Sequence, residues 1–235
     1  MFIIGFILDK STKIYKPSTN DDISIAKYIT WTIYKGYTLN NTITITNNWY
    51  ININMGGTIT NSGTIKNNVS GIITNVGSIN INIGGTITNI GIIRINTSGI
   101  MTNNIGGIIN NNKYGRLNIM KGGIINNNAL LNNNNYGTID SNKGTINNNI
   151  GRIFTGDIYG DVTNDTTGIL NNDGLITNIG PIINNGIINN KIGGKFTFDT
   201  PSDITIKITN NSMGTINNDG VITNNGPIDN DGGNK

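Results

Sequence analysis

A short unit of the form Gly-x-Ile-x-Asn recurs along this chain, and almost every step from one copy to the next is even. It begins at Gly57 (GTITNS), Gly63 (GTIKNNVS), Gly71 (GIITNV) and Gly77 (GSININIG), so that steps of 6 and 8 residues alternate. Because the side chains of an extended strand alternate between two faces, an even step returns isoleucine to the same face each time. The repeat therefore predicts many short strands that share one buried face.

The numbering of the isoleucines shows how far that shared face extends. The isoleucine two residues after the glycine is odd-numbered from Ile59 to Ile139, and the same position is even-numbered from Val162 to Ile228. A change of parity requires an odd insertion, since even steps preserve the phase. We therefore predict a bend, a bulge or a corner insertion near residues 140–160.

Composition excludes most other fold classes and most catalytic chemistry. The 235 residues include 50 Ile, 48 Asn and 32 Gly, whereas Glu, Gln, His and Cys are absent, Ala occurs twice and Leu seven times. Most residues that favour helices are therefore scarce or missing. The usual general bases, zinc ligands and thiol nucleophiles are missing as well. We expect an all-β chain that is not an enzyme and that binds no cofactor and no metal.

Glycine and asparagine between very short strands favour a single-stranded parallel β-helix, or β-solenoid, over a β-sandwich. Both residue types tolerate the positive φ angles of tight corners, and stacked coils would place Asn over Asn in hydrogen-bonded ladders. Three units of 6 to 8 residues give a three-sided coil of about 20 to 22 residues, while the 14-residue pairs would also fit a two-sided coil. We favour three sides and about nine turns.

The chain divides by composition into a cap, an array and a tail. Residues 1–42 contain Asp21, Asp22 and much of the aromatic content, which is typical of a segment that covers an open solenoid end. Residues 43–225 are the expected array, interrupted at 194–213 by a hairpin or loop that carries Phe196 and Phe198 on one face. Residues 226–235 (GPIDNDGGNK) are the expected capping tail.

One acidic cluster is the alternative catalytic candidate. Asp157, Asp161, Asp165 and Asp173 follow one another at short spacing, and paired carboxylates can bind or hydrolyse a glycan. Solvated turn aspartates explain the same pattern. The alternative function is therefore a carbohydrate-binding or carbohydrate-cleaving β-helix.

Apolar residues directly after glycine are the candidate contact surface. Ile72, Ile92, Ile108 and Ile124 stand on the outward phase of their units, and with Phe196 and Phe198 they could form an exposed contact surface. Single exposed isoleucines are also normal on protein surfaces, so the pattern leaves both interpretations open.

Charge and hydropathy bear on the partner classes. The formal charge of +3 comes from scattered residues without a Lys/Arg run, so we expect no nucleic-acid partner. No apolar stretch reaches the length of a membrane span. A protein or glycan surface partner and self-association remain the expected contacts.

The repeats GTITNSGTIKN, together with Tyr34 to Asn61 (YKGYTLNNTITITNNWYININMGGTITN), resemble the haemagglutinin-type and adhesin-like β-helix repeats of bacterial surface proteins. The resemblance covers roughly residues 34–232 and implies a right-handed coil with a structural or adhesive role. The Ile/Asn bias is also similar to that of Asn-rich repeat proteins of giant viruses of amoebae. The resemblance implies a location in a virion or the host cytoplasm if the chain is viral, and on a cell surface if it is bacterial.

Overall fold

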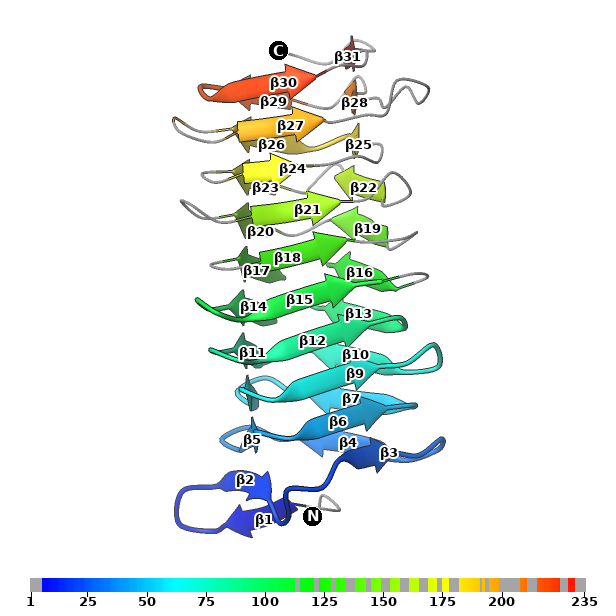
Figure 1. Ribbon diagram of the computed structural model, residues 1–235, viewed down its shortest axis with the longest axis vertical. Helices are drawn as coiled ribbons and strands as arrows, with labels where there is room; N and C mark the ends of the chain where they lie inside the picture. The colour runs from blue at the N-terminus through cyan, green and yellow to red at the C-terminus, as the bar shows by residue number, and fades with distance from the viewer. Residues whose placement is uncertain are drawn as a thin grey trace.

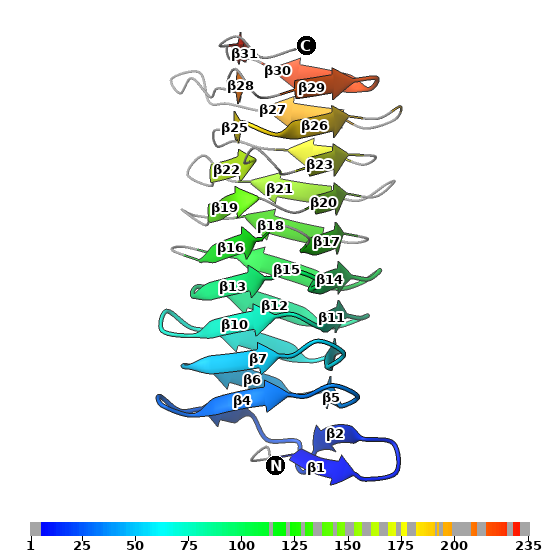
Figure 2. The same cartoon turned by 180° about the vertical axis from the view of Figure 1, so that it is seen from behind.

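The computed structural model is a straight stack of coils built from short strands (Figures 1 and 2). It describes residues 6–112, 115–120, 123–127, 130–133, 138–142, 145–148, 153–156, 161–164, 169–172, 175–177, 182–190, 192, 195–198, 208–210, 215–224 and 228–230. None of these residues is helical. The predicted all-β class is confirmed.

Three sheets run along the stack, with 11, 10 and 10 strands. Sheet I consists of β1 (Phe6–Asp9), β2 (Ile14–Pro17), β5 (Thr38–Asn41), β8 (Thr58–Asn61), β11 (Ser78–Ile81), β14 (Ile100–Asn103), β17 (Ile124–Asn127), β20 (Thr145–Asn148), β23 (Ile169–Asn172), β26 (Ile187–Asn190) and β29 (Thr215–Asn218). Sheet II consists of β3 (Ile23–Ile25), β6 (Thr44–Asn47), β9 (Thr64–Asn67), β12 (Thr86–Asn89), β15 (Ile108–Asn111), β18 (Leu130–Asn133), β21 (Ile153–Gly156), β24 (Leu175–Thr177), β27 (Lys195–Phe198) and β30 (Val221–Asn224). Sheet III consists of β4 (Thr30–Ile33), β7 (Tyr50–Ile53), β10 (Ile72–Asn75), β13 (Ile92–Ile95), β16 (Arg116–Ile119), β19 (Thr138–Asn142), β22 (Asp161–Asn164), β25 (Ile182–Asn184), β28 (Ile208–Asn210) and β31 (Ile228–Asn230).

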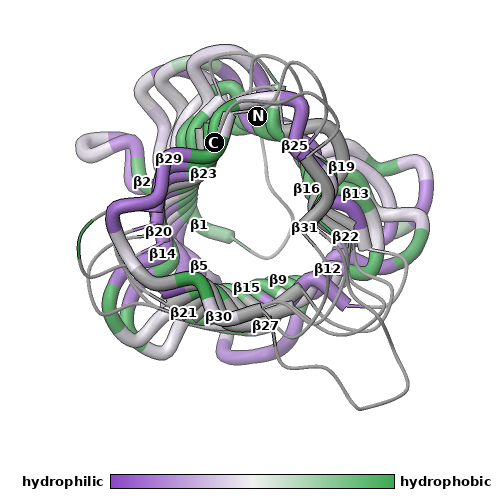
Figure 3. The backbone as a smooth tube through the Cα atoms, turned by 90° about the horizontal axis from the view of Figure 1, so that it is seen from above, coloured by the Kyte–Doolittle hydropathy of each residue, from purple (hydrophilic) through white to green (hydrophobic). Residues whose placement is uncertain are grey.

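The chain visits the sheets in the order I, II, III and climbs one level with each circuit. Seen from above, sheet I lies at the left, sheet II at the bottom and sheet III at the right (Figure 3). The arrows of sheet II run left to right across the front as the chain climbs (Figure 1), so the coil is right-handed and three-sided. With ten or eleven strands in each sheet, the predicted nine turns is a small mismatch.

Neighbouring coils are stacked in register. Ile73 of β10 lies between Ile51 of β7 and Ile93 of β13, and the pairing is parallel on both sides. Strands of four residues suffice inside the stack because each is hydrogen-bonded to the coil below and to the coil above. Stacked asparagines are between 18 and 28 residues apart in sequence, so coil length varies around the predicted value.

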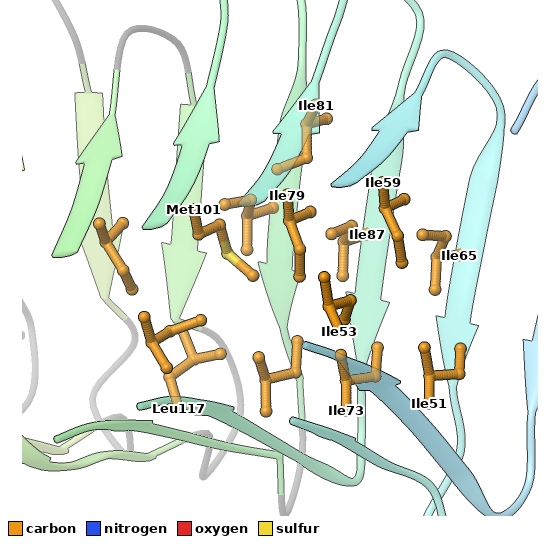
Figure 4. Close-up of a cluster of buried hydrophobic side chains, with 14 of the residues drawn as sticks. Ile51, Ile53, Ile59, Ile65, Ile73, Ile79, Ile81, Ile87, Met101 and Leu117 are labelled. Atoms are coloured by element: carbon orange, nitrogen blue, oxygen red, sulfur yellow. The ribbon is translucent and has the colours of Figure 1, made fainter. Parts of the chain in front are cut away.

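Isoleucine fills the space between the three sheets (Figure 4). Ile59 and Ile79 come from sheet I, Ile65 and Ile87 from sheet II, and all are at most 1% exposed. Each such side chain contributes about 1.5–3 kcal/mol relative to an exposed one. The predicted buried face is confirmed on odd numbers up to Leu131 and on even numbers from Leu170 to Ile188.

The parity of the buried face changes between β19 and β20. Ile139 of β19 is paired with Leu117, whereas Ile146 of β20 is paired with Ile125, so the register of the ladders is kept while the numbering shifts. The pairing of β19 with β22 shifts register between Ile139 and Asn142. A bulge of this kind accommodates one extra residue, so that the following strands keep the same face toward the interior.

Buried asparagines form a second set of interior columns, as the stacking of Asn over Asn predicted. The Nδ2 atom of Asn47 donates to Oδ1 of Asn67 at 2.7 Å, Asn67 donates to Asn89 at 2.7 Å, and Asn89 donates to Asn111 at 2.8 Å. The same residues also donate to the backbone, as from Asn67 Nδ2 to the Gly71 and Ile92 carbonyl oxygens. The amides are therefore buried with their hydrogen bonds satisfied.

These asparagines also close the short corners. In the six-residue units the Asn side chain accepts a backbone hydrogen bond two residues on, from Gly77 N–H to Asn75 Oδ1 at 3.1 Å and from Gly186 N–H to Asn184 Oδ1 at 3.3 Å. A Cβ on Gly77 would overlap the carbonyl oxygen of Gly57 in the coil below. The geometry of the corner therefore requires the Asn-x-Gly pattern, which does not merely reflect the high Asn and Gly content of the chain.

Several of the longer corners in the eight-residue units are β-turns with a positive φ. In the corner after Ile53, the Gly57 N–H donates to the Asn54 carbonyl at 2.8 Å, and Gly56 has a φ of 76°. Gly84 and Gly106 take the same place with φ of 77° and 80°, and Ser98 takes it with 68°. Glycine is favoured there because it has no Cβ.

The N-terminal end differs from the array. β1 and β2 form an antiparallel hairpin on the end of sheet I, and the buried Phe6 contacts Trp31 edge-to-face with ring centroids 5.6 Å apart. The parallel ladders already include β3, β4 and β5, which lie inside the segment 1–42 that the sequence assigned to the cap. Among the described strands, only β1 lies outside the parallel ladders, because β2 itself pairs in parallel with β5.

At the other end, the two strands inside the interruption 194–213 join different sheets. β27 pairs with β24 and β30, and β28 pairs with β25 and β31. The residues that connect β27 to β28, where the hairpin or loop was predicted, lie outside the described residues. Of the tail 226–235, Ile228–Asn230 forms β31.

Candidate functional site

The acidic cluster lies almost entirely outside the described residues. Asp157, Asp165 and Asp173 are not described, and Asp161 is described only as the first residue of β22, where it is in register with Thr138. Within the described part of the chain, no group of three or more potential metal ligands of the His, Cys, Asp or Glu type is present. The alternative catalytic hypothesis therefore stays a hypothesis.

The four candidate contact isoleucines lie on three different faces. Ile72 and Ile92 are adjacent in sheet III, Ile108 belongs to sheet II, and Ile124 to sheet I. Each is partly exposed. They form no single stripe, because the steps from Ile92 to Ile108 and from Ile108 to Ile124 are not whole coils. In sheet II, Ile108 is in register with Leu130, Leu130 with Ile153, and Ile153 with Leu175.

The two candidate phenylalanines both belong to β27. Phe196 is in register with Ile176, which is buried, and with Ile222. Phe198 is in register with Asn224. A contact role for Phe196 and Phe198 stays a prediction.

An aromatic corner between sheets II and III is the most distinctive surface feature of the first coils. The corner after β3 is a β-turn in which the Ile29 N–H donates to the Ala26 carbonyl at 3.1 Å, and Tyr28 has a φ of 71°. This is the place that Gly56 and Gly84 take in later corners. A tyrosine in the left-handed region costs about 1–2 kcal/mol of conformational free energy, so Tyr28 is present despite local backbone strain.

The next coil places a tryptophan where its counterparts have glycine. Trp49 follows Asn47-Asn48, as Gly63 follows Asn61-Ser62, and its N–H donates to Asn47 Oδ1 at 3.3 Å. Its ring centroid lies 5.1 Å from that of Tyr28 and 5.0 Å from that of Tyr50. The three rings, from two successive coils, form one connected group that we call the aromatic corner (Tyr28, Trp49 and Tyr50).

Polar side chains border the aromatic corner. The Nδ2 atom of Asn48 donates to Ser24 Oγ at 3.0 Å and to the Ile25 carbonyl at 3.2 Å, and Asn68 Nδ2 donates to Asn48 Oδ1 at 2.7 Å. The Lys27 ammonium lies 5.0 Å from the centre of the Tyr28 ring. A hydrogen-bonded group of Asn48, Asn68 and Ser24 therefore adjoins Trp49 in the chain through Asn48, and a cation lies over the Tyr28 ring.

Two groups in the N-terminal region have shifted pKa values. Hydrogen bonds from the side chains of Ser11 and Thr12 and from their backbone lower the pKa of Asp9 from 3.8 to about 2. Burial raises the pKa of Tyr15, and the neighbouring Tyr37 raises it further. Both groups belong to the hairpin and to the packing beneath it, so neither has the environment of a catalytic acid or base.

No family model and no curated protein matches this chain. Among solved structures, it is similar to the crystal structure of a TibC-catalysed hyper-glycosylated TibA55-350 fragment, with a TM-score of 0.26 and 18% identity over 90% of this chain and 98% of that chain. A likeness at this level contributes no argument about function. Among the described residues, no helix is long and apolar enough to cross a membrane.

Sequence reasoning missed the aromatic corner because Tyr28 and Trp49 were counted as parts of a cap and of an entry segment. The signal was present in the repeat itself. Asn47-Asn48-Trp49 aligns with Asn61-Ser62-Gly63, so an aromatic residue stands where the repeat has glycine. Aligning corners as well as isoleucines would have found it.

Proposed function

We propose that the protein is a non-enzymatic structural or adhesive solenoid, a rigid rod that presents contact surfaces on a virion or a cell surface. The observation that carries this proposal is the continuous interior of the coils. Rows of buried isoleucine and hydrogen-bonded asparagine connect the described coils inside the stack, while corners and outward strand positions vary in sequence. Such a scaffold suits the display of surface side chains at fixed spacing.

Contacts with a protein or a glycan are the expected mode of action. Exposed apolar side chains at the corners, such as Met55, Ile83 and Ile105, are 60% exposed or more, and they protrude where an approaching surface would meet them first. The predicted contact residues Ile72, Ile92, Ile108 and Ile124 would add to these on the flat faces.

The test measures attachment and turnover on the same purified protein. Binding to immobilised cells, virions and glycans is recorded together with the release of reducing sugar ends. The proposal expects attachment without sugar release. Sugar release that disappears in Asp161→Asn and Asp165→Asn would replace it with the glycan-cleaving alternative, and absence of attachment to every surface would also contradict it.

A further inference from the structure

The aromatic corner combines features that packing alone does not require. Tyr28 keeps a φ of 71° at a turn position that is glycine in the corners of Gly56 and Gly84. Its side chain is nevertheless 74% exposed, so burial does not offset the strain of its backbone. A bulky residue held in a strained turn with its ring in solvent is more typical of a binding surface than of a structural core.

The rings form an angled platform for a small ring-shaped ligand. Tyr28 and Trp49 are tilted at 55° with centroids 5.1 Å apart, and Tyr50 meets Trp49 edge-on at 84°. The faces of such rings carry partial negative charge and attract the weakly positive C–H groups of a ligand. Because the rings come from two hydrogen-bonded coils, their spacing is fixed before a ligand arrives.

Polar groups suited to hydroxyls lie beside the platform. The carboxamides of Asn48 and Asn68 are joined to each other at 2.7 Å and remain partly exposed, and Ser24 is exposed. A carboxamide offers both donors and acceptors, so it can bind hydroxyl groups of either orientation. Aromatic faces next to such amides match a molecule with one apolar face and a rim of hydroxyls.

The local charge argues against a polyanion. Lys27 lies over the Tyr28 ring, while Asp21 and Asp22 precede β3 on the same coil and Asp22 accepts a hydrogen bond from the Thr44 N–H. Nucleic-acid platforms combine stacked rings with a groove of positive charge. Lys27 lies after β3, whereas Asp21 and Asp22 precede that strand, and one lysine beside the rings does not make such a groove, which favours a neutral ligand.

We propose that the aromatic corner binds a neutral saccharide, with its C–H face on Tyr28 and Trp49 and its hydroxyls on Asn48 and Asn68. The assignment rests on the proposed adhesive role, since it names the ligand class that one surface of the rod recognises. Tyr50 and Lys27 complete the border of the site.

The experiment is a fluorescence titration of the full chain, which contains only two tryptophans. Trp31 is 3% exposed, so a ligand-dependent change reports on Trp49. The probes are neutral manno-, gluco- and N-acetylglucosamine oligosaccharides, compared with a single-stranded oligonucleotide. We expect a saturable change with at least one neutral saccharide and none with the oligonucleotide.

Two variants separate binding from folding. Tyr28→Gly removes the ring and relieves the positive φ, so saccharide affinity should fall at least tenfold while the melting temperature stays equal or rises. Tyr34→Ala removes an exposed tyrosine from a different corner and should change neither quantity. A wild-type protein that responds to no neutral saccharide, tighter binding of the oligonucleotide, or undiminished affinity in Tyr28→Gly would each overturn the assignment.

The same variants distinguish this proposal from the adhesive role. If Tyr28→Gly binds soluble saccharide as tightly as the wild type does and also attaches to surfaces, the saccharide site is wrong and the adhesive role stands. If the wild type binds soluble saccharide but attaches to no surface, the site stands and the adhesive role is wrong.

Discussion

Pairs of stacked asparagines occur both inside and outside the coil, and they contribute differently to stability. Inside, Asn67 Nδ2 donates to Asn89 Oδ1 at 2.7 Å over 22 residues of sequence; outside, Asn104 Nδ2 donates to Asn82 Oδ1 at 2.9 Å over the same 22 residues. The interior donor, Asn67, precedes its acceptor in the sequence, whereas the exterior donor, Asn104, follows its acceptor. The difference in stability comes from water, which can replace a lost bond only outside.

The contrast explains where the chain conserves its pattern and where it varies. The described interior positions are apolar residues, glycine and buried Asn. Exterior positions vary at equivalent registers, as with Lys66, Thr88 and Asn110 in sheet II. Stability therefore constrains the inside, and the outside is available for recognition.

The largest expected difference between the two regions comes from adjacent residues of β12. Ile87 is fully buried and Thr86 faces outward. Ile87→Asn should lower the free energy of unfolding by about 3–5 kcal/mol, because burial is lost and an amide is left without partners, whereas Thr86→Asn should change it by less than about 1 kcal/mol. Chemical denaturation of both variants measures this, and equal midpoints would mean that the assignment of faces is wrong.

The asparagine rows give the next largest effect. Asn89→Ala removes bonds to Asn67, Asn111 and two backbone carbonyls, and should lower the free energy of unfolding by about 2–3 kcal/mol. Asn104→Ala removes one partly exposed bond and should stay within about 0.5 kcal/mol of the wild type. A loss in Asn104→Ala as large as that in Asn89→Ala would remove the distinction between the rows.

The corners offer a smaller and reciprocal test. Ser98 and Gly84 take the same turn position, with φ of 68° and 77°. Ser98→Gly should raise the free energy of unfolding by about 0.5–1 kcal/mol and Gly84→Ser should lower it by about the same amount, because only glycine adopts this φ without strain. Thermal melting of the two variants checks the signs, and changes of the same sign would contradict this explanation.

The smallest effect concerns the exposed hairpin loop. Since the folded pKa of Asp9 lies below its unfolded value of 3.8, the loop contact is present above that value and is lost as the pH falls through about 2. Ser11→Ala should return the pKa toward 3.8, because the Ser11 hydroxyl is the largest cause of the shift. NMR titration of the Asp9 carboxyl measures it, and an unchanged pKa would exclude Ser11 as the cause.

The sequence predicts the interior well because period-two spacing and glycine steps are local signals. Ile59, Ile79 and Ile87 could be assigned to the core from number parity alone. The sequence does not predict which strand-end residues stack in one row, as with Ile81 between Asn61 and Asn103, because the stacking depends on the coils above and below. The repeat is also not recognisable in the first coil, because Tyr28 occupies the turn position that later corners fill with glycine. The start of the ladders was therefore not predicted from the sequence.

Hydrogen exchange of the asparagine side-chain amides tests the central claim most directly, which is that isoleucine and asparagine rows form one continuous interior. In ¹⁵N-labelled protein, the Nδ2 hydrogens of Asn67 and Asn89 should exchange only through unfolding, at least about a thousandfold more slowly than those of Asn104. Equal exchange rates for all three residues would show that the inner rows are open to water, and would contradict the account.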